Sequence, residues 1–154
     1  VGGEMHDEAL VEQLASEFQR EHGIDLRVDA FALSRLLDGA EKARHELSSA
    51  PATAVSLPFI TADAKGPKHL HRELSRSEFE AAADGALGGF SLERLCLDAL
   101  ADAGVDKAQL GALLLTGGMM RTPHLRARVE RAVGQCALDV GLNPEDACAV
   151  GAAL

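Results

Sequence analysis

The chain has 154 residues, 47% of them apolar, which is enough to build the core of one ordinary domain or of two small lobes. Its formal net charge is −9, and its aromatic residues are five phenylalanines only. Such a chain offers neither the positive charge that nucleic acids and anionic lipids require nor the rings on which bases stack. No apolar run approaches the roughly 20 residues of a membrane span, so we expect no direct binding to nucleic acid or membrane.

Two amphipathic helices are predicted at the start of the chain. In the first, over residues 7–22, apolar side chains recur at helical spacing, and Gly23 ends the helix. Asp29 can cap the second helix, which carries one continuous apolar stripe and ends before Pro51.

A β-hairpin is predicted next, with strands over residues 54–61 and 69–74 and a long loop between them. Ser75 and Glu78 then have the spacing of a capping box, so they open a helix that runs toward Gly85. His69 and His71 alternate along the second strand, as the side chains on one solvated face of a strand do.

The second half of the chain is predicted to be mostly helical around one apolar strand. Gly88-Gly89 interrupts the chain, Ser91 can cap a helix, and residues 106–109 form a short turn. Residues 112–116 are apolar on both faces, which is typical of a strand inside a sheet. Either the upstream hairpin pairs with this strand, or something outside this sequence completes the sheet.

Two further helices are predicted after that strand. The first begins with Thr122 as its cap and Pro123 as its first residue, and runs to about Cys136. Asn143-Pro144 predicts the start of the last helix in the same way. The result is a mixed α and β protein in which helices dominate.

The cysteines are Cys96, Cys136 and Cys148, which are widely spaced and have apolar neighbours. Their odd number and spacing favour buried thiols in a reducing compartment over a disulfide framework or a metal knuckle. The histidines show no metal-ligand spacing such as two His four residues apart on a helix.

A glycine pair joins the apolar strand to the helix that follows it. Gly117 and Gly118 would let a ligand approach the backbone closely, and Arg121 follows within reach, so the turn is a candidate nucleotide cradle. The same pattern is also typical of a simple tight connection between a strand and a helix.

The second helix carries a polar stripe beside its apolar one. Its members are Glu41, Arg44, His45 and Ser48, whose spacing places them on one face. Such a stripe is often only a solvated face. Its chemistry nevertheless suits an adenosine, because a carboxylate and a hydroxyl can bond ribose or base edges and an arginine can stack on a purine.

Five motifs occur in a fixed order along the chain, at residues 2–4, 40–49, 57–63 with 66–69, 117–123, and 143–147 with 151–153. In this order they resemble the 70-kDa heat-shock chaperones across essentially the whole chain. The hairpin sequence is most similar to the bacterial DnaK and mitochondrial branch.

The resemblance implies an α/β fold that is part of an actin-like ATPase domain, in which two lobes close over a nucleotide. The chain would be the rear part of the second lobe, helix-rich, with a small hairpin subdomain and an incomplete sheet. It would divide into a first helix at the lobe junction (1–28), an outer helical and hairpin subdomain (29–90), and a helix-strand-helix-helix part of the inner subdomain (91–154).

The resemblance also implies an adenosine site in two parts. One part would comprise Gly3, Glu41, Arg44 in place of the usual lysine, His45 and Ser48. The other would comprise Gly117, Gly118 and Arg121, with Glu145 where the family has aspartate.

The family's phosphate loops, its lysine and the aspartates that organise magnesium lie upstream of the matched region. Phosphoryl transfer depends on positioning and on electrostatic stabilisation of the phosphates. This chain alone is therefore expected to hold ATP or ADP only by the adenosine side, without Mg, and neither to hydrolyse ATP nor to bind peptides.

Two interpretations stay open, because Met5, His6, Met119 and Thr122 depart from the family's motifs. In the first, the chain is a piece of a chaperone ATPase domain, and its partners are the remainder of that chain and a nucleotide-exchange factor. In the second, it is a nucleotide-free structural subunit of a larger organellar assembly, in which a neighbouring chain completes the sheet. The mitochondrial matrix is favoured over a bacterial-type cytoplasm.

Overall fold

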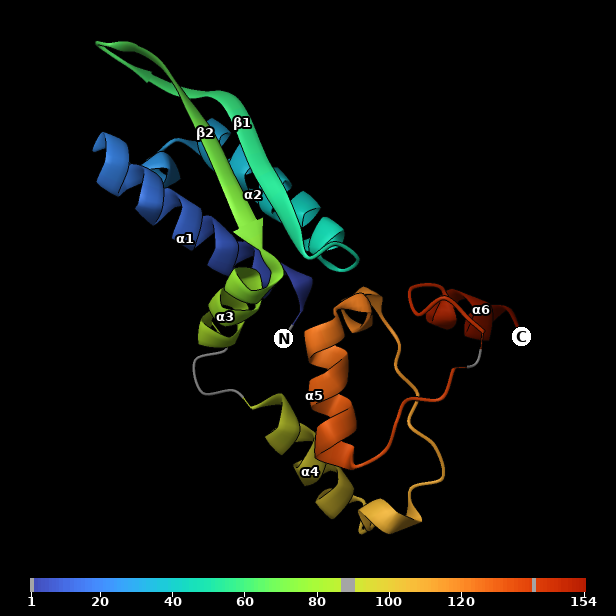
Figure 1. Ribbon diagram of the computed structural model, residues 1–154. Coiled ribbons are helices and arrows are strands. Elements are labelled where there is room, and N and C mark those ends of the chain that lie inside the picture. Colours follow the sequence, from blue (N-terminus) through green and yellow to red (C-terminus); the bar gives the residue numbers. More distant parts are fainter. Residues whose placement is uncertain (1, 87–90, 140) are drawn as a thin grey trace. The chain divides into compact units, whose positions relative to one another are not determined.

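The computed structural model describes residues 2–86, 91–139 and 141–154, which form two compact units, Val1–Gly88 and Gly89–Leu154 (Figure 1). The predicted division into residues 1–28, 29–90 and 91–154 stays a prediction. The predicted break at Gly88-Gly89 lies outside the described residues. None of the described helices combines the length and apolar character that a membrane span requires.

The first unit begins with two helices, α1 (Gly3–His22) and α2 (Ala30–Leu47), joined through the short 3-10 helix η1 (Leu26–Val28). Helix α1 begins earlier than predicted, so Gly3 is its first residue, and it ends as predicted at Gly23, whose φ is 72°. The predicted cap of α2 is confirmed, because the Asp29 carboxylate accepts hydrogen bonds from two amides of the first turn.

The hairpin consists of β1 (Ala52–Asp63) and β2 (Gly66–Ser75), which pair in antiparallel fashion. The prediction of a long loop was wrong, since Asp63 pairs with Gly66 and only two residues connect the strands. The strands are longer than predicted because Gly66 and Pro67, which usually indicate a turn, belong to β2. Glycine at a φ of 116° and proline on a strand edge are both compatible with strand pairing. The register shifts once, between Leu57 and Thr61.

The shift in register is a bulge of β1 that α2 supports. Phe59 lies in the bulge with a φ of 53°, and its ring packs edge-on against the His69 ring of β2, with 4.6 Å between centroids. From α2, Arg35 donates hydrogen bonds to the carbonyls of Phe59 at 2.9 Å and of Pro58 at 2.7 Å. The bulge is therefore held by both of its neighbours.

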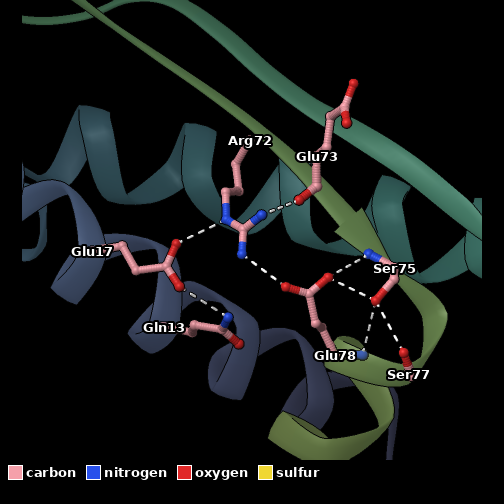
Figure 2. A network of polar contacts seen from close by, with 7 residues as sticks. All are labelled: Gln13, Glu17, Arg72, Glu73, Ser75, Ser77 and Glu78. Atoms are coloured by element: carbon pink, nitrogen blue, oxygen red, sulfur yellow. Dashed lines mark hydrogen bonds and ion pairs between the residues drawn. The ribbon is translucent and has the colours of Figure 1, made fainter.

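Helix α3 (Arg76–Ala86) begins with the predicted capping box. The amide of Glu78 donates to Ser75 Oγ at 3.2 Å, and the amide of Ser75 donates to Glu78 Oε2 at 2.9 Å. Arg72 extends this network to α1, because it bonds both Glu78 at 2.8 Å and Glu17 at 3.0 Å (Figure 2). Hydrogen bonds from Ser75 and then from Arg72 lower the pKa of Glu78 to about 2.

The core of the first unit lies where α1 packs against α2 and α3, and where α2 packs against β1. Leucines at helical spacing on α1 and α2 supply most of it, as their apolar stripes predict. Its largest fully buried side chains are Phe79, Leu10, Leu14, Leu26, Leu36, Leu47 and Leu74.

The second unit contains α4 (Leu92–Asp102), α5 (Pro123–Val133) and α6 (Ala147–Ala153), with the short 3-10 helices η2 (Lys107–Gln109) and η3 (Gly118–Arg121). Helices α4 and α5 pack against each other. The predicted cap of α4 is confirmed, since Ser91 Oγ accepts the amide of Arg94 at 3.1 Å.

The predicted strand at residues 112–116 is wrong for the described part of the chain. It is reduced to one parallel bridge between Leu113 and Ala137, with the amide of Leu138 donating to the Leu113 carbonyl at 2.8 Å. A strand requires a ladder of partners, and the described hairpin pairs only with itself. Leu114 and Leu138 on either side of this bridge are each 57% exposed.

Two helix boundaries and one helix cap in the second unit differ from the prediction. Pro123 is the first residue of α5 as predicted, but Thr122 makes no side-chain cap bond. The helix ends at Val133 because Gly134 adopts a φ of 78°. Helix α6 begins at Ala147 rather than at Asn143-Pro144. The Asn143 side chain accepts the amide of Glu145 at 3.3 Å, as a cap does, but residues 144–146 form a turn instead of a helix.

The prediction of buried thiols was also wrong. Cys136 and Cys148 are exposed, and Cys96 is half-buried. Desolvation, together with the nearby charge of Glu93, raises the pKa of the Cys96 thiol, so this group stays protonated at neutral pH. The apolar residues next to each cysteine in the sequence did not predict that the thiol is buried. The second unit is small, so a large part of its surface stays exposed to solvent.

Candidate functional site

The polar stripe of α2 is anchored to α1 by an ion pair that the sequence does not reveal. The Nε–H of Arg44 donates to Asp7 Oδ1 at 2.7 Å, and the two side chains are only 11% and 10% exposed. Glu41, one turn before Arg44 on α2, places Oε1 at 3.5 Å from Arg44 Nη2. Arg44 therefore lies between a buried carboxylate and an exposed one.

A pocket of about 270 Å³ opens beside this ion pair, within the first unit. It is lined by Glu4 and Asp7 of α1 and by Leu37, Asp38, Glu41 and Arg44 of α2. Four of these six side chains are carboxylates, so the lining offers hydrogen-bond acceptors and one guanidinium. Among the residues that the structure describes, no group of three or more His, Cys, Asp or Glu side chains is arranged to hold a metal ion.

The remaining predicted residues of the first unit lie near the pocket but do not line it. Ser48 Oγ donates to the Arg44 carbonyl at 3.1 Å, so its proton is engaged on its own helix. His45 is exposed, with Nε2 at 3.8 Å from Glu41 Oε1. Gly3 begins α1, one residue before Glu4.

In the second unit, the glycine turn is joined to the segment that precedes α6. Gly117 has a φ of 91°, which favours glycine, and its amide donates to the Pro144 carbonyl at 2.8 Å. A Cβ atom on Gly118 would lie 3.1 Å from Glu145 Oε1, the far end of a flexible side chain, so a larger residue here would push Glu145 aside. The predicted Gly117, Gly118 and Glu145 thus lie together.

Arg121 is held at the end of this turn by two partners. Its Nη2 donates to Asn143 Oδ1 at 2.7 Å, and its Nε lies 3.4 Å from Glu145 Oε1. Its side chain remains half exposed, so the guanidinium is oriented without being covered. An oriented, accessible guanidinium can stack on a flat ring or donate hydrogen bonds to an acceptor.

Sequence reasoning missed Asp7, Glu4, Asp38 and Asn143. Glu4 and Asp7 are three residues apart on α1, and Asp38 and Glu41 repeat that spacing on α2. This spacing shows that each pair shares a helix face, but only the packing of the two helices brings the pairs together. Asn143 was interpreted as a helix cap because its role with Arg121 depends on a contact 22 residues away.

Comparison with models of protein families gives a match to HSP70, described as Hsp70 protein, over residues 1–154.

Proposed function

Because this chain belongs to the Hsp70 family of nucleotide-binding chaperones, we propose that it is the rear part of the second lobe of a DnaK-type nucleotide-binding domain. In that domain it supplies the adenosine side of the ATP and ADP site. The observation that carries this proposal is the acidic pocket beside Arg44, between α1 and α2 of the first unit.

The charges of the pocket select one end of a nucleotide. Glu4, Asp38 and Glu41 carry negative charge, and the charge of Arg44 is already paired with Asp7. Such a lining repels phosphate groups. The hydroxyls of a ribose and the amino group of an adenine are donors, and carboxylate oxygens are the acceptors that they need.

The ion pair prepares Arg44 for a flat ligand. Asp7 fixes the guanidinium through Nε, so the side chain loses little further freedom when a purine stacks on its face. Glu41 is exposed and can turn its free carboxylate oxygen toward a ribose hydroxyl. In this proposal Ser48 and His45 border the ligand. Gly3, which has no side chain, leaves room for the ligand at the start of α1.

The second unit, taken by itself, has a candidate adenosine contact at its glycine turn. Gly117 and Gly118 permit close approach to the backbone, and Arg121 presents an oriented guanidinium held by Asn143 and Glu145. The one cation among these side chains, Arg121, is engaged by Asn143 and Glu145. We propose that this segment does not hydrolyse ATP or clamp unfolded peptides by itself, because the family's phosphate loops and magnesium aspartates lie upstream of the matched region. A nucleotide-exchange factor that contacts the outer hairpin subdomain belongs to the same proposal.

The test compares ADP with adenosine in isothermal titration on the full-length protein. Glu41→Gln and Arg44→Ala are expected to weaken both ligands by the same factor, about tenfold, because the lost contacts are to the nucleoside. Lys42→Ala is the matched control, since Lys42 lies on the same helix and pairs only loosely with Glu46 at 3.9 Å. Unchanged ADP binding by both site variants would overturn the proposal.

A second candidate function is a nucleotide-free structural subunit of a larger assembly. The exposure of Leu114 and Leu138 beside the single Leu113–Ala137 bridge favours it, because a neighbouring strand would cover these side chains. It predicts that the native protein co-purifies in fixed ratio with other chains. Micromolar binding of ADP to the isolated chain would contradict it.

A further inference from the structure

A second pocket in the first unit lies along the hairpin, away from the adenosine residues. Its volume is about 370 Å³, and it runs between α1 and β2. Six consecutive residues of β2, 67–72, line one side, and Leu14, Glu17, Phe18, Glu21 and His22 of α1 line the other. Figure 1 shows β2 as the strand of the hairpin that lies nearer to α1. The pocket is thus a groove between a helix and the outer edge of a two-stranded sheet.

The register of the hairpin determines which backbone groups face this groove. The amide of Arg76 donates to the Pro51 carbonyl at 2.9 Å, and the ladder then places Leu74 opposite Thr53 and Leu70 opposite Leu57. In an antiparallel pair, residues bonded to the partner strand alternate with residues that are not. Even-numbered residues of β2 therefore bond β1, and odd-numbered residues turn their N–H and C=O groups to the outer edge.

Three observations agree with this assignment. The amide of Ser75 bonds Glu78 rather than β1, and the Glu73 carbonyl accepts a hydrogen bond from Arg72 (Figure 2). Pro67, which has no N–H, occupies an odd position, where a strand tolerates proline. In the part of the chain that the structure describes, the backbone N–H and C=O groups of His69 and His71 have no partner on this edge.

The charged side chains along the groove differ in how closely they are paired with opposite charges. Arg72 is bonded to Glu17 and Glu78, and Lys68 lies 3.5 Å from Asp63. Glu21 stands on the α1 side with its side chain 76% exposed. Among the described residues its carboxylate pairs with His22 alone, at 3.7 Å, which is an ion pair only when that histidine is protonated. The lining holds two cations and two carboxylates, and the most exposed of these four side chains is the carboxylate of Glu21, in a chain whose net charge is −9.

We propose that this groove binds an extended, basic segment of a partner protein, which adds to the outer edge of β2 as a third strand. The backbone of the segment bonds the N–H and C=O groups of His69 and His71. A lysine or arginine of the segment reaches the Glu21 carboxylate, and α1 closes the other side of the groove. Strand addition to an open edge gives affinity through the main chain, and the neighbouring charge gives preference for a basic sequence.

The test uses two labelled peptides of about six residues, one alternating valine and lysine and the other valine and glutamate, in fluorescence anisotropy with the full-length protein. The lysine peptide is expected to bind and the glutamate peptide to fail. His71→Pro removes an outward N–H and no bond to β1, and should weaken binding about tenfold. His71→Ala keeps the N–H and is the matched control, with binding unchanged. Glu21→Lys should abolish the preference for lysine.

A second measurement does not depend on the proline variant folding. In the wild-type protein, saturating lysine peptide is expected to slow hydrogen exchange of the His69 and His71 amides, while the amides of α4 stay unchanged. Equal binding of both peptides, or no slowing at these two amides, would overturn the proposal. A wild-type dimer that His71→Pro dissociates would also overturn it, because a second copy of this chain would then be the occupant of the edge.

Discussion

Arg44 and Asp7 join α2 to α1 across 37 residues of sequence, through a 2.7 Å hydrogen bond between side chains that are almost buried. A buried pair of this kind stabilises a fold less than its geometry implies, because both ions lose their water. Removing one partner is a different matter, since the other charge stays buried without its closest ion pair. The pair therefore holds α1 and α2 in the arrangement that shapes the acidic pocket.

Asp7→Ala is expected to lower the free energy of unfolding by about 3 kcal/mol, because Arg44 is left without its buried partner. Urea unfolding followed by circular dichroism measures the change. The double variant Asp7→Leu with Arg44→Met should regain most of the loss while still failing to bind adenosine. If the double variant is as unstable as Asp7→Ala, the loss of stability does not come from an unpaired charge, and the prediction is wrong.

His6→Phe is expected to raise the free energy of unfolding by about 1 kcal/mol. The His6 side chain is 3% exposed, and within the described residues its Nε2 atom has no hydrogen-bond partner, while its ring lies 6.4 Å from that of Phe79. Phenylalanine removes the unpaired nitrogen and adds apolar contact. Thermal unfolding compares it with His71→Phe, an exposed position where no gain is expected. A loss of stability would mean that the bond from His6 Nδ1 to the Gly2 carbonyl, 2.9 Å long, matters more.

Acid should loosen the second unit through Glu93. Hydrogen bonds, first from Arg128, and then from its own backbone amide and from Ser91, lower the pKa of this carboxyl from its usual 4.5 to about 2. A carboxyl with a lowered folded-state pKa adds stability that is complete above about 4.5 and is lost as the pH falls toward about 2. Hydrogen exchange of the α4 amides should therefore accelerate across that window. Glu93→Gln should remove the acceleration, and a pH dependence that survives this substitution would contradict the assignment.

The glycine turn should tolerate alanine poorly at both positions, for different reasons. Gly117→Ala forces a side chain into a φ of 91°, and we expect a cost of about 1–2 kcal/mol. Gly118→Ala places a methyl group 3.1 Å from Glu145 Oε1, so it should displace Glu145 and leave Arg121 with its bond to Asn143. Gly111→Ala is the control, because no atom lies within 4 Å of its added Cβ. Chemical denaturation and ADP titration of the three variants distinguish strain from loss of the Arg121 contact.

Most signals that act over a few residues could be predicted from the sequence, although the expected cap at Thr122 makes no side-chain bond. Asp29, Ser91 and the Ser75–Glu78 pair satisfy amides of the first helical turn next to them, so their effect depends on no distant partner. Gly23 ends α1 for an equally local reason, since it adopts a left-handed conformation without strain.

Features that depend on distant neighbours were not predictable in the same way. Residues 112–116 have the composition of a strand, yet a strand exists only where a second one supplies its hydrogen bonds. Asn143 Oδ1 accepts the amide of Glu145 at 3.3 Å, as a cap does, but its shorter bond, at 2.7 Å, comes from the distant charged donor Arg121. For the candidate site, helical spacing found Glu41 and Arg44, and only tertiary packing could add Asp7.

Arg35 and Arg44 lie nine residues apart on α2. Arg35 donates hydrogen bonds to the bulge of β1, and Arg44 donates one to α1. The helix between them is unbroken, so about 14 Å of continuous helix separates the two contacts. A tilt of α2 at the Arg44 end must swing the Arg35 end through a proportionate arc. Any movement of α2 at the acidic pocket is thus passed on to the hairpin.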